Sequence, residues 1–449
     1  MYDERYLDIE GIEEEIAREE VLSASAPGMT SDPTELTTIS TIIRDTRILL
    51  CKARGTISRR KLTPRANWMP SRTSSIVSRL KVEDLKDSIG SLGSRDIRLG
   101  TVDDDSTFSI QAEALDGKIT VITGRKESGK SHLAKILLRG LLDNGAYSVV
   151  FDLNDEYGSV GKLKDGTETS SDRKVRVMRP GRDLKFSLNS VGLRAVTNLL
   201  SHSLDMPGTS LREFVKIWEQ LDARDELSLS SLELAIQQWR CNEFVRDALF
   251  ARYHTIASCG LFTDSAHQQF DLRDFFLLNR DGGALIVSLG GVSPLNRKMV
   301  VELILSKLVE LLEKRKIPPL FLFAEEAHLY LRDTYWEDLI TRMRHFGIFT
   351  LFVTNQPDAI DQKIYRQVDN IFLYNFSSDS DLNLVSQASM ADTDTVKAIV
   401  RTLPPKVCLL LGNAVHNLPV IVNIDPFDSP PTGGTRTFFG AEMAIEVGA

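Results

Sequence analysis

The segment GRKESGKSHLAK, residues 124–135, restricts the fold of this chain more than any other stretch. Gly124, Gly129, Lys130 and Ser131 match the pattern G-x-x-x-x-G-K-[ST], in which main-chain N–H groups surround a phosphate. The pattern requires a strand before the loop and a helix after it. Both are predicted here, because KITVIT is a β-branched run and SHLAKILLRGLLDNG has apolar residues at helical spacing.

The chemistry of such a loop predicts ATP and Mg²⁺ as cofactors. The N-terminus of a helix favours an anion, Lys130 would reach the β- and γ-phosphates, and Ser131 would ligate Mg²⁺. The residues that we expect to contact the nucleotide are Gly124, Arg125, Lys126, Glu127, Ser128, Gly129, Lys130, Ser131 and His132.

Two carboxylates follow the buried strand predicted in LFLFAEEAH, and ATP hydrolysis needs carboxylates at such a position. We assign Glu325 to Mg²⁺ and Glu326 to the attacking water. The apolar run GIFTLFVT ends in TNQP, so Thr354, Asn355 and Gln356 are candidates for contacting the γ-phosphate. The alternative is that TNQP only caps the strand.

Strands and helices alternate along most of the chain, which predicts an α/β fold with a mostly parallel, twisted sheet. The further strands expected are YSVVFD, GALIVSL, PLFLFA, NIFLYN, KVCLLL and LPVIVNI, and residues 187–275 carry amphipathic helical stripes. We divide the chain into an N-terminal module of uncertain fold that docks a partner (1–96), a first part of the ATPase core (97–186), a helical insertion (187–275), a second part of the core (276–425) and a C-terminal arm (426–449).

The N-terminal residues are unevenly charged and begin with a segment that we expect to be helix-like. Residues 1–36 carry 11 acidic and 2 basic side chains, whereas residues 44–81 carry 11 Lys or Arg against one acid, Asp45. Either the acidic tail docks on the basic segment, or the basic segment faces nucleic acid. The acidic start is no signal or transit peptide, and no apolar run approaches the roughly 18 residues of a membrane span. We therefore expect a cytoplasmic protein that makes no membrane contact.

The motifs, taken in order, resemble those of the HerA branch of the HerA/FtsK superfamily. The resemblance covers roughly residues 97–425 and rests on VITGRKESGKSHLAKILL, VVFDLNDEYG, LFLFAEEAHLYL, RMRHFGIFTLFVTNQP and LPPKVCLLLGNAVHNLPVIV, the last similar to a closing L-P-x-G-x-x-L-x-x-G segment. It implies a RecA-like P-loop ATPase core. By position, Asp152 and Glu156 match acids after the family's second strand, and we expect both to belong to the nucleotide site. Arg344 matches an arginine that would enter the neighbouring subunit's nucleotide site.

The same resemblance implies a function. Such proteins are homohexameric rings that use ATP to translocate double-stranded DNA, so we expect a translocase or helicase. Its partner would be a NurA-type nuclease or another effector protein, in DNA-end processing or antiviral defence. The alternative is a nucleotide-dependent ring scaffold that assembles and activates a partner effector enzyme, with little translocation of its own.

Overall fold

The computed structural model describes residues 3–6, 47–50, 55–59, 61–63, 76, 78, 92–102, 106–169, 171–331, 342–376, 378–388 and 393–430. The chain divides into two compact units, Met1–Gly90 with Asp394–Ile399, and Ser91–Thr393 with Val400–Ala449. Most of the predicted N-terminal module and the C-terminal arm beyond residue 430 lie outside the described residues. Both therefore stay predictions.

Within the first unit, the described residues form two antiparallel strand pairs. Strand β1 (Asp3–Tyr6) pairs with β2 (Arg47–Leu50), and β3 (Thr56–Ser58) pairs with β4 (Lys61–Thr63). The expectation of a helix-like start is therefore wrong at residues 3–6. The physical reason is the partner: the main chain of β1 bonds to a strand that lies far away in the sequence, which local composition does not reveal.

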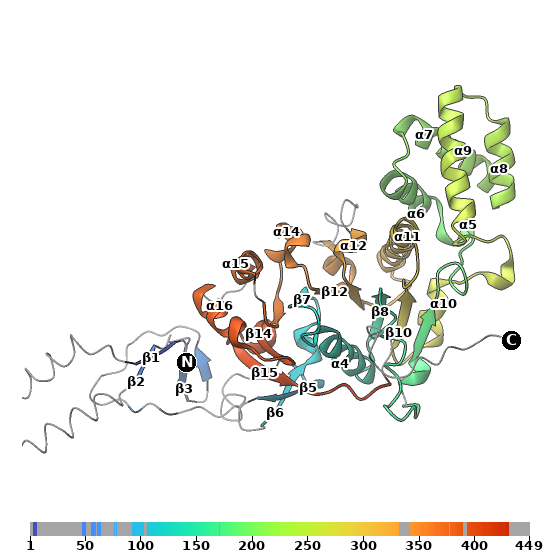
Figure 1. Cartoon of the computed structure of the whole chain (residues 1–449). Coiled ribbons are helices and arrows are strands. Elements are labelled where there is room, and N and C mark those ends of the chain that lie inside the picture. Colours follow the sequence, from blue (N-terminus) through green and yellow to red (C-terminus); the bar gives the residue numbers. More distant parts are fainter. Residues whose placement is uncertain are drawn as a thin grey trace, which may run out of the picture. The chain divides into compact units, whose positions relative to one another are not determined.

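The second unit is built on a large twisted sheet, which has eleven strands in the described part of the chain, in the order β6-β5-β15-β14-β13-β7-β12-β11-β8-β10-β9 (Figure 1). The strands are β5 (Asp96–Val102), β6 (Ser106–Gln111), β7 (Thr120–Thr123), β8 (Tyr147–Asp152), β9 (Val175–Met178), β10 (Gly283–Ser288), β11 (Leu320–Glu325), β12 (Ile348–Thr354), β13 (Asn370–Leu373), β14 (Val407–Gly412) and β15 (Val420–Ile424).

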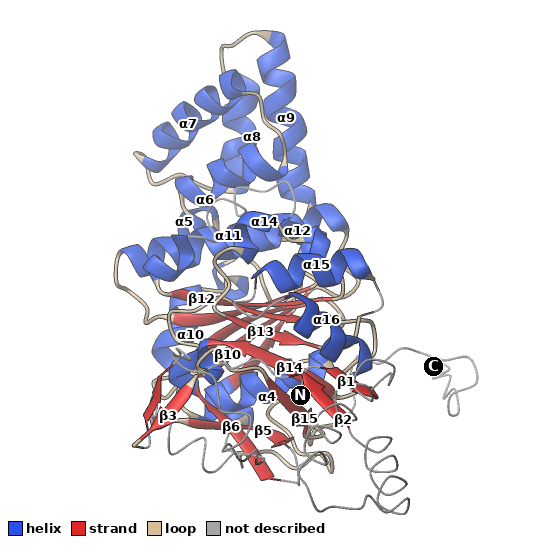
Figure 2. Cartoon of the chain, turned by 90° about the vertical axis from the view of Figure 1, so that its left-hand side faces the viewer, coloured by secondary structure: helices blue, strands red, loops and turns tan. Residues whose placement is uncertain are grey.

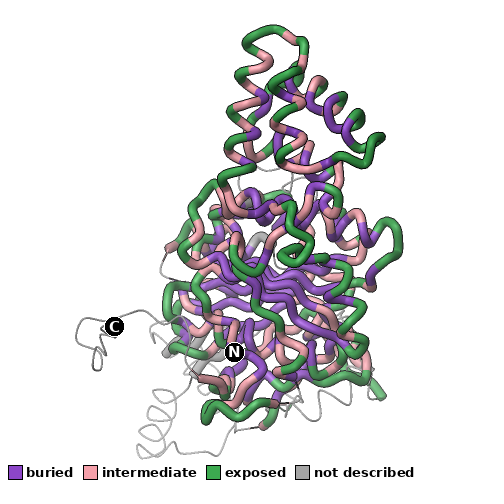
Figure 3. Tube along the Cα trace, turned by 90° about the vertical axis from the view of Figure 1, so that its right-hand side faces the viewer, coloured by how far each residue is buried: buried purple, intermediate pink, exposed green. Residues whose placement is uncertain are grey.

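The parallel part of the sheet runs from β13 to β9, and its central strands are buried on both faces. Every residue of β7, β10, β11, β12 and β13 is buried (Figure 3). Continuous apolar runs are typical of parallel strands covered by helices on both sides. The expectation of a mostly parallel sheet in an α/β fold is confirmed. The remaining strands β14, β15, β5 and β6 are antiparallel to their neighbours.

Helices cover both faces of this sheet. The chain passes from β7 to β8 through α4 (Lys130–Asp143), but it returns across the sheet from β10 to β11 through α11 (Pro294–Glu313). Because such crossovers are right-handed, opposite directions place the two helices on opposite faces. Figure 2 shows this arrangement, with α4 on one side and α11, α14 (Gln362–Tyr365) and α15 (Asp379–Ala388) on the other.

Residues between β9 and β10 form a mainly helical segment, and α7, α8 and α9 project away from the sheet (Figure 1). Its helices are α5 (Leu188–Val191), α6 (Leu193–Asn198), the π-helical turn η3 (Leu199–Ser203), α7 (Gly208–Asp222), α8 (Leu229–Gln238), α9 (Glu243–Ser258), η4 (Ala266–Gln268) and α10 (Leu272–Leu278). The remaining short elements are η1 (Ala112–Ala114), η2 (Asp172–Lys174), α12 (His328–Leu331), η5 (Pro357–Ala359), α16 (Thr393–Thr402) and η6 (Asn413–Val415).

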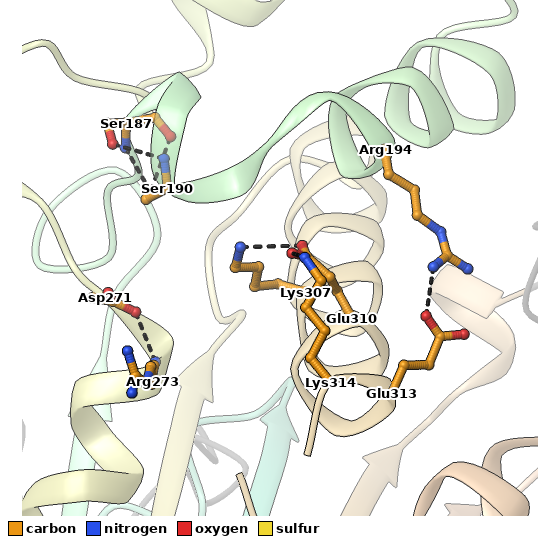
Figure 4. A network of polar contacts seen from close by, with 9 residues as sticks. All are labelled: Ser187, Ser190, Arg194, Asp271, Arg273, Lys307, Glu310, Glu313 and Lys314. Carbon is orange, nitrogen blue, oxygen red and sulfur yellow. Dashed lines mark hydrogen bonds and ion pairs between the residues drawn. The ribbon is translucent and has the colours of Figure 1, made fainter. Parts of the chain in front are cut away.

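Polar contacts at the base of the helical segment fix where its helices begin and how they meet α11 (Figure 4). Ser187 and Ser190 form a reciprocal capping box at α5, and the Asp271 side chain caps α10. Arg194 on α6 forms an ion pair with Glu313 at the end of α11, with Nη1 and Oε2 2.6 Å apart. This ion pair links the helical segment to the helix that leads into β11. None of the helices in the described ranges is long and apolar enough to cross a membrane.

Candidate nucleotide-binding site

The loop between β7 and α4 has the tight shape that its glycines allow. Gly129 has φ +113°, a conformation that other residues rarely adopt, and it precedes the first residue of α4. A Cβ atom built on Gly124 would lie 2.4 Å from the Cβ of Tyr374, so a side chain there is excluded. The Tyr374 hydroxyl donates to the carbonyl of Gly129 at 3.2 Å, so the tyrosine also supports the loop.

A cavity of about 840 Å³ opens over this loop at the carboxyl ends of the parallel strands. Ligands in open α/β sheets bind at this edge. Of the residues predicted for the site, those that line the cavity are Lys126, Glu127, Gly129, Lys130, Ser131, His132, Glu156, Glu325, Glu326, Asn355 and Gln356. The structure therefore brings the loop, the two glutamates and the TNQP segment around one space.

Lys130, the first residue of α4, is a buried cation that faces carboxylates. Its Nζ donates to the carbonyl of Arg125 at 2.9 Å across the loop. Burial lowers the pKa of Lys130, and the negative charges of Glu326, Glu325 and, less strongly, a third glutamate act in the opposite direction. An anionic ligand in the cavity would add further negative charge beside this ammonium group.

Glu325, the last residue of β11, is 3% exposed and lies against Ser131. The Ser131 hydroxyl donates to its Oε1 at 3.4 Å, and its Oε2 forms no hydrogen bond in the described part of the chain. Burial, followed by the negative charge of Asp152, raises the pKa of Glu325 to about 8. Carboxylate and hydroxyl oxygens are ligands that suit Mg²⁺, and a cation would relieve the unpaired Oε2. These two side chains therefore fit a Mg²⁺ ion.

Glu326 is held at the cavity wall by the end of β12. It has φ +45°, and its Oε2 accepts from the Thr354 hydroxyl and from the main-chain N–H of Asn355, both at 3.4 Å. The Nδ1 of His328 lies 3.5 Å from the same oxygen. The Oδ1 of Asn355 is buried without a hydrogen bond among the described residues. An oriented carboxylate and an unpaired amide oxygen at one wall can hold a water molecule.

Asp152 and Glu156 occupy different positions although both follow β8. Asp152 does not line the cavity; its carboxylate accepts from the main-chain N–H groups of Glu156, at 3.0 Å, and Tyr157, at 2.9 Å. Burial raises the pKa of Asp152 to about 6, and these two hydrogen bonds lower it. Glu156 lines the cavity and pairs with Lys135 at 3.7 Å. Asp152 thus shapes the turn that presents Glu156.

The other predicted residues lie outside the cavity wall. Gly124, Arg125 and Ser128 belong to the loop but are not among the residues that line the cavity in the described part of the chain. Arg344 is half-buried on a helical turn at residues 342–346, before β12, and it does not line the cavity either. Arg344 therefore does not reach the nucleotide cavity of its own chain.

Sequence reasoning missed several residues of the cavity wall, which are Leu153, Asn154, His328, Leu329, Val353, Pro405 and Lys406. His328 lies inside the AEEAH segment, so the sequence could have predicted its position beside the glutamates. The position of Lys406 could not be predicted in this way, because it precedes β14 and lies near the loop only as a result of the strand order in the sheet.

In sequence, the chain is similar to known helicases. Residues 97–308 match the family model described as "Helicase HerA, central domain". Over 412 residues, the chain is 22% identical to the DNA double-strand break repair helicase HerA of Sulfolobus acidocaldarius, covering 86% of this chain and 78% of that protein. A helicase of the same name from Sulfurisphaera tokodaii is 30% identical over 130 residues, which are 27% of this chain and only 26% of that protein.

In structure, the chain is similar to a coupling protein of bacterial conjugation and to a second solved protein, VirB4. The conjugative coupling protein TrwB, in complex with sulphate, has a TM-score of 0.52 at 13% identity, covering 74% of this chain and 90% of that chain. VirB4 of Thermoanaerobacter pseudethanolicus also has a TM-score of 0.52, at 14% identity, covering 75% of this chain and 98% of that chain. TrwB has also been solved with a non-hydrolysable ATP analogue, and that structure has a TM-score of 0.51 at 14% identity, covering 73% of this chain and 89% of that chain. At these identities the likeness establishes the fold.

Proposed function

We propose, from the premise that this chain is a HerA-like P-loop ATPase, that it is a motor that couples ATP hydrolysis to the movement of double-stranded DNA. The observation that carries the proposal is one cavity lined by Lys130, Ser131, Glu325 and Glu326. The similarity to helicases named for DNA double-strand break repair supports DNA as the substrate.

Each side chain of the cavity has a role in this proposal. Lys130 and the main-chain N–H groups of the loop would bind the phosphates, and Ser131 and Glu325 would hold Mg²⁺. Bound there, Mg²⁺ would neutralise the charge of the phosphates. Glu326 would orient the attacking water and accept its proton, because its Oε2 is already directed by Thr354. Asn355 would contact the γ-phosphate or that water.

The position of Arg344 supports a ring. Phosphoryl transfer of this kind gains from an arginine beside the γ-phosphate, and Arg344 does not line the cavity of its own chain. A head-to-tail arrangement that closes on itself would place Arg344 of one copy in the site of the next. We propose a homohexamer of this kind, working with a NurA-type nuclease or another effector protein in DNA-end processing or antiviral defence.

A mixing experiment tests whether sites are shared between copies. Glu326→Gln and Arg344→Ala should each abolish ATP hydrolysis alone. Mixed in equal amounts, they should regain activity, because about one site in four would combine an intact Glu326 with an intact Arg344 from the neighbour. Arg342→Ala, at an exposed position on the same helical turn, should leave hydrolysis unchanged. If Arg344→Ala keeps full activity, or if the mixture stays inactive, the proposal of a shared site is wrong.

A further inference from the structure

We infer that Lys406 is a second phosphate-binding cation of the nucleotide site, which contacts the α- and β-phosphates and sets nucleotide affinity without taking part in hydrolysis. The inference rests on the proposed nucleotide site and adds to it a residue on the wall opposite the catalytic glutamate. The ligand it would take is a nucleoside di- or triphosphate.

The order of strands places Lys406 opposite the catalytic wall. The P-loop leaves β7, which lies between β12 and β13. Glu326 follows β11 and Asn355 follows β12, on one side of the loop, whereas Lys406 directly precedes β14, on the other side. All three line the cavity. A nucleotide with its γ-phosphate toward Glu326 would therefore extend its α-phosphate and nucleoside toward Lys406.

The main chain fixes Lys406 against the P-loop. Its N–H donates to the carbonyl of Ser128 at 3.0 Å, and its own carbonyl accepts from the N–H of Ile424 on β15 at 2.9 Å. A Cβ atom built on Gly129 would lie 3.5 Å from the Cα of Lys406, which is van der Waals contact. The lysine side chain thus starts within contact distance of the last glycine of the loop.

The conformation of Lys406 is unfavourable for a lysine. Its φ is +67°, in the left-handed region that favours glycine. A backbone outlier at a ligand site points to a function for the side chain, since glycine would fit the same conformation without strain.

The charge of Lys406 is available to a ligand. The residue is exposed, and no ion pair or side-chain hydrogen bond among the described residues involves its ammonium group. A cation on the cavity wall that has no partner of its own can pair with phosphate oxygens.

The variant Lys406→Gly tests the inference, because it removes the cation while relieving the backbone strain. We expect the Kd of N-methylanthraniloyl-ADP and the KM for ATP both to rise about tenfold, with kcat within about twofold of the wild type. Lys406→Arg should restore both constants. The matched control is Arg315→Gly, which also replaces an exposed cation at positive φ, here +51°, away from the cavity. This control should change neither constant.

Three results would overturn the inference. An unchanged Kd for the ADP analogue in Lys406→Gly would exclude a phosphate contact. A fall in kcat at constant KM would mean that Lys406 takes part in hydrolysis. Weaker binding of ATP with normal binding of ADP would place Lys406 at the γ-phosphate. The variant Lys130→Ala distinguishes a wrong role for Lys406 from a wrong location of the nucleotide site. If Lys130→Ala loses ADP binding while Lys406→Gly does not, only the role of Lys406 is wrong; if both bind normally, the nucleotide lies elsewhere.

Discussion

Replacing Glu325 by glutamine should stabilise the protein in the absence of Mg²⁺ and nucleotide. The pKa of the folded carboxyl is raised from 4.5 to about 8 by burial and by the neighbouring carboxylate of Asp152. The folded state therefore binds a proton more tightly than the unfolded chain does. This contribution to stability is complete below pH 4.5 and is lost as the pH rises to about 8.

The size of the effect follows from the two pKa values. At both pH values the carboxyl is ionised in the unfolded chain and mainly protonated in the folded one. This difference lowers the free energy of unfolding by about 4 kcal/mol at pH 7.5 and by about 2 kcal/mol at pH 6. Glutamine has nearly the same shape and no such cost. A buried amide atom without a partner would offset roughly 1–3 kcal/mol of the gain at both pH values. The difference between the two pH values, about 2 kcal/mol in favour of the variant at pH 7.5, does not depend on that offset.

Urea unfolding of the wild type and Glu325→Gln in EDTA, at pH 6 and pH 7.5, measures this difference. The control is Glu219→Gln, at an exposed position on α7, which should give the same small change at both pH values. If the advantage of Glu325→Gln does not increase between pH 6 and pH 7.5, the assignment of a raised pKa to this carboxyl is refuted.

Three further predictions concern the same cavity. Glu326→Gln should lower kcat for ATP hydrolysis by at least about 100-fold while nucleotide binding persists, as measured by steady-state kinetics and fluorescence titration. Gly124→Ala should weaken nucleotide binding at least about tenfold, because its Cβ would lie 2.4 Å from the Cβ of Tyr374. The control is Gly208→Ala, whose Cβ would meet nothing within 4 Å and which should bind nucleotide normally. Binding of Mg²⁺-ATP at pH 7 should release up to about one proton from Glu325, seen by calorimetry in buffers of different ionisation enthalpy; no release would contradict its role as a metal ligand.

The sequence predicts the centre of the fold well because the information there is local. The apolar runs that become β7, β8, β10, β11, β12 and β13 are buried strands in the structure. The hairpin of β5 and β6 and the edge strand β9 were missed, since short, partly exposed strands have no such runs. The antiparallel direction of β14 and β15 was missed as well, because an apolar run does not show which way its strand will pair.

In the candidate site, too, residues marked by local sequence patterns could be predicted, and residues placed by the strand order could not. Lys130, Ser131, Glu325 and Glu326 could be found because each stands directly after a recognisable strand or loop. Lys406 could not, because its contact with the P-loop depends on strand order and on a main-chain hydrogen bond to Ser128. For the N-terminal module the sequence predicts only a helix-like start, which is wrong at residues 3–6 because β1 pairs there with β2.

The rate of ATP hydrolysis with and without linear duplex DNA, together with the particle mass from light scattering in the same samples, tests whether the chain is a DNA-dependent ring motor. We expect a hexamer whose hydrolysis is stimulated by DNA and is lost in Lys130→Ala and in Arg344→Ala. A monomer whose hydrolysis does not respond to DNA would contradict this expectation.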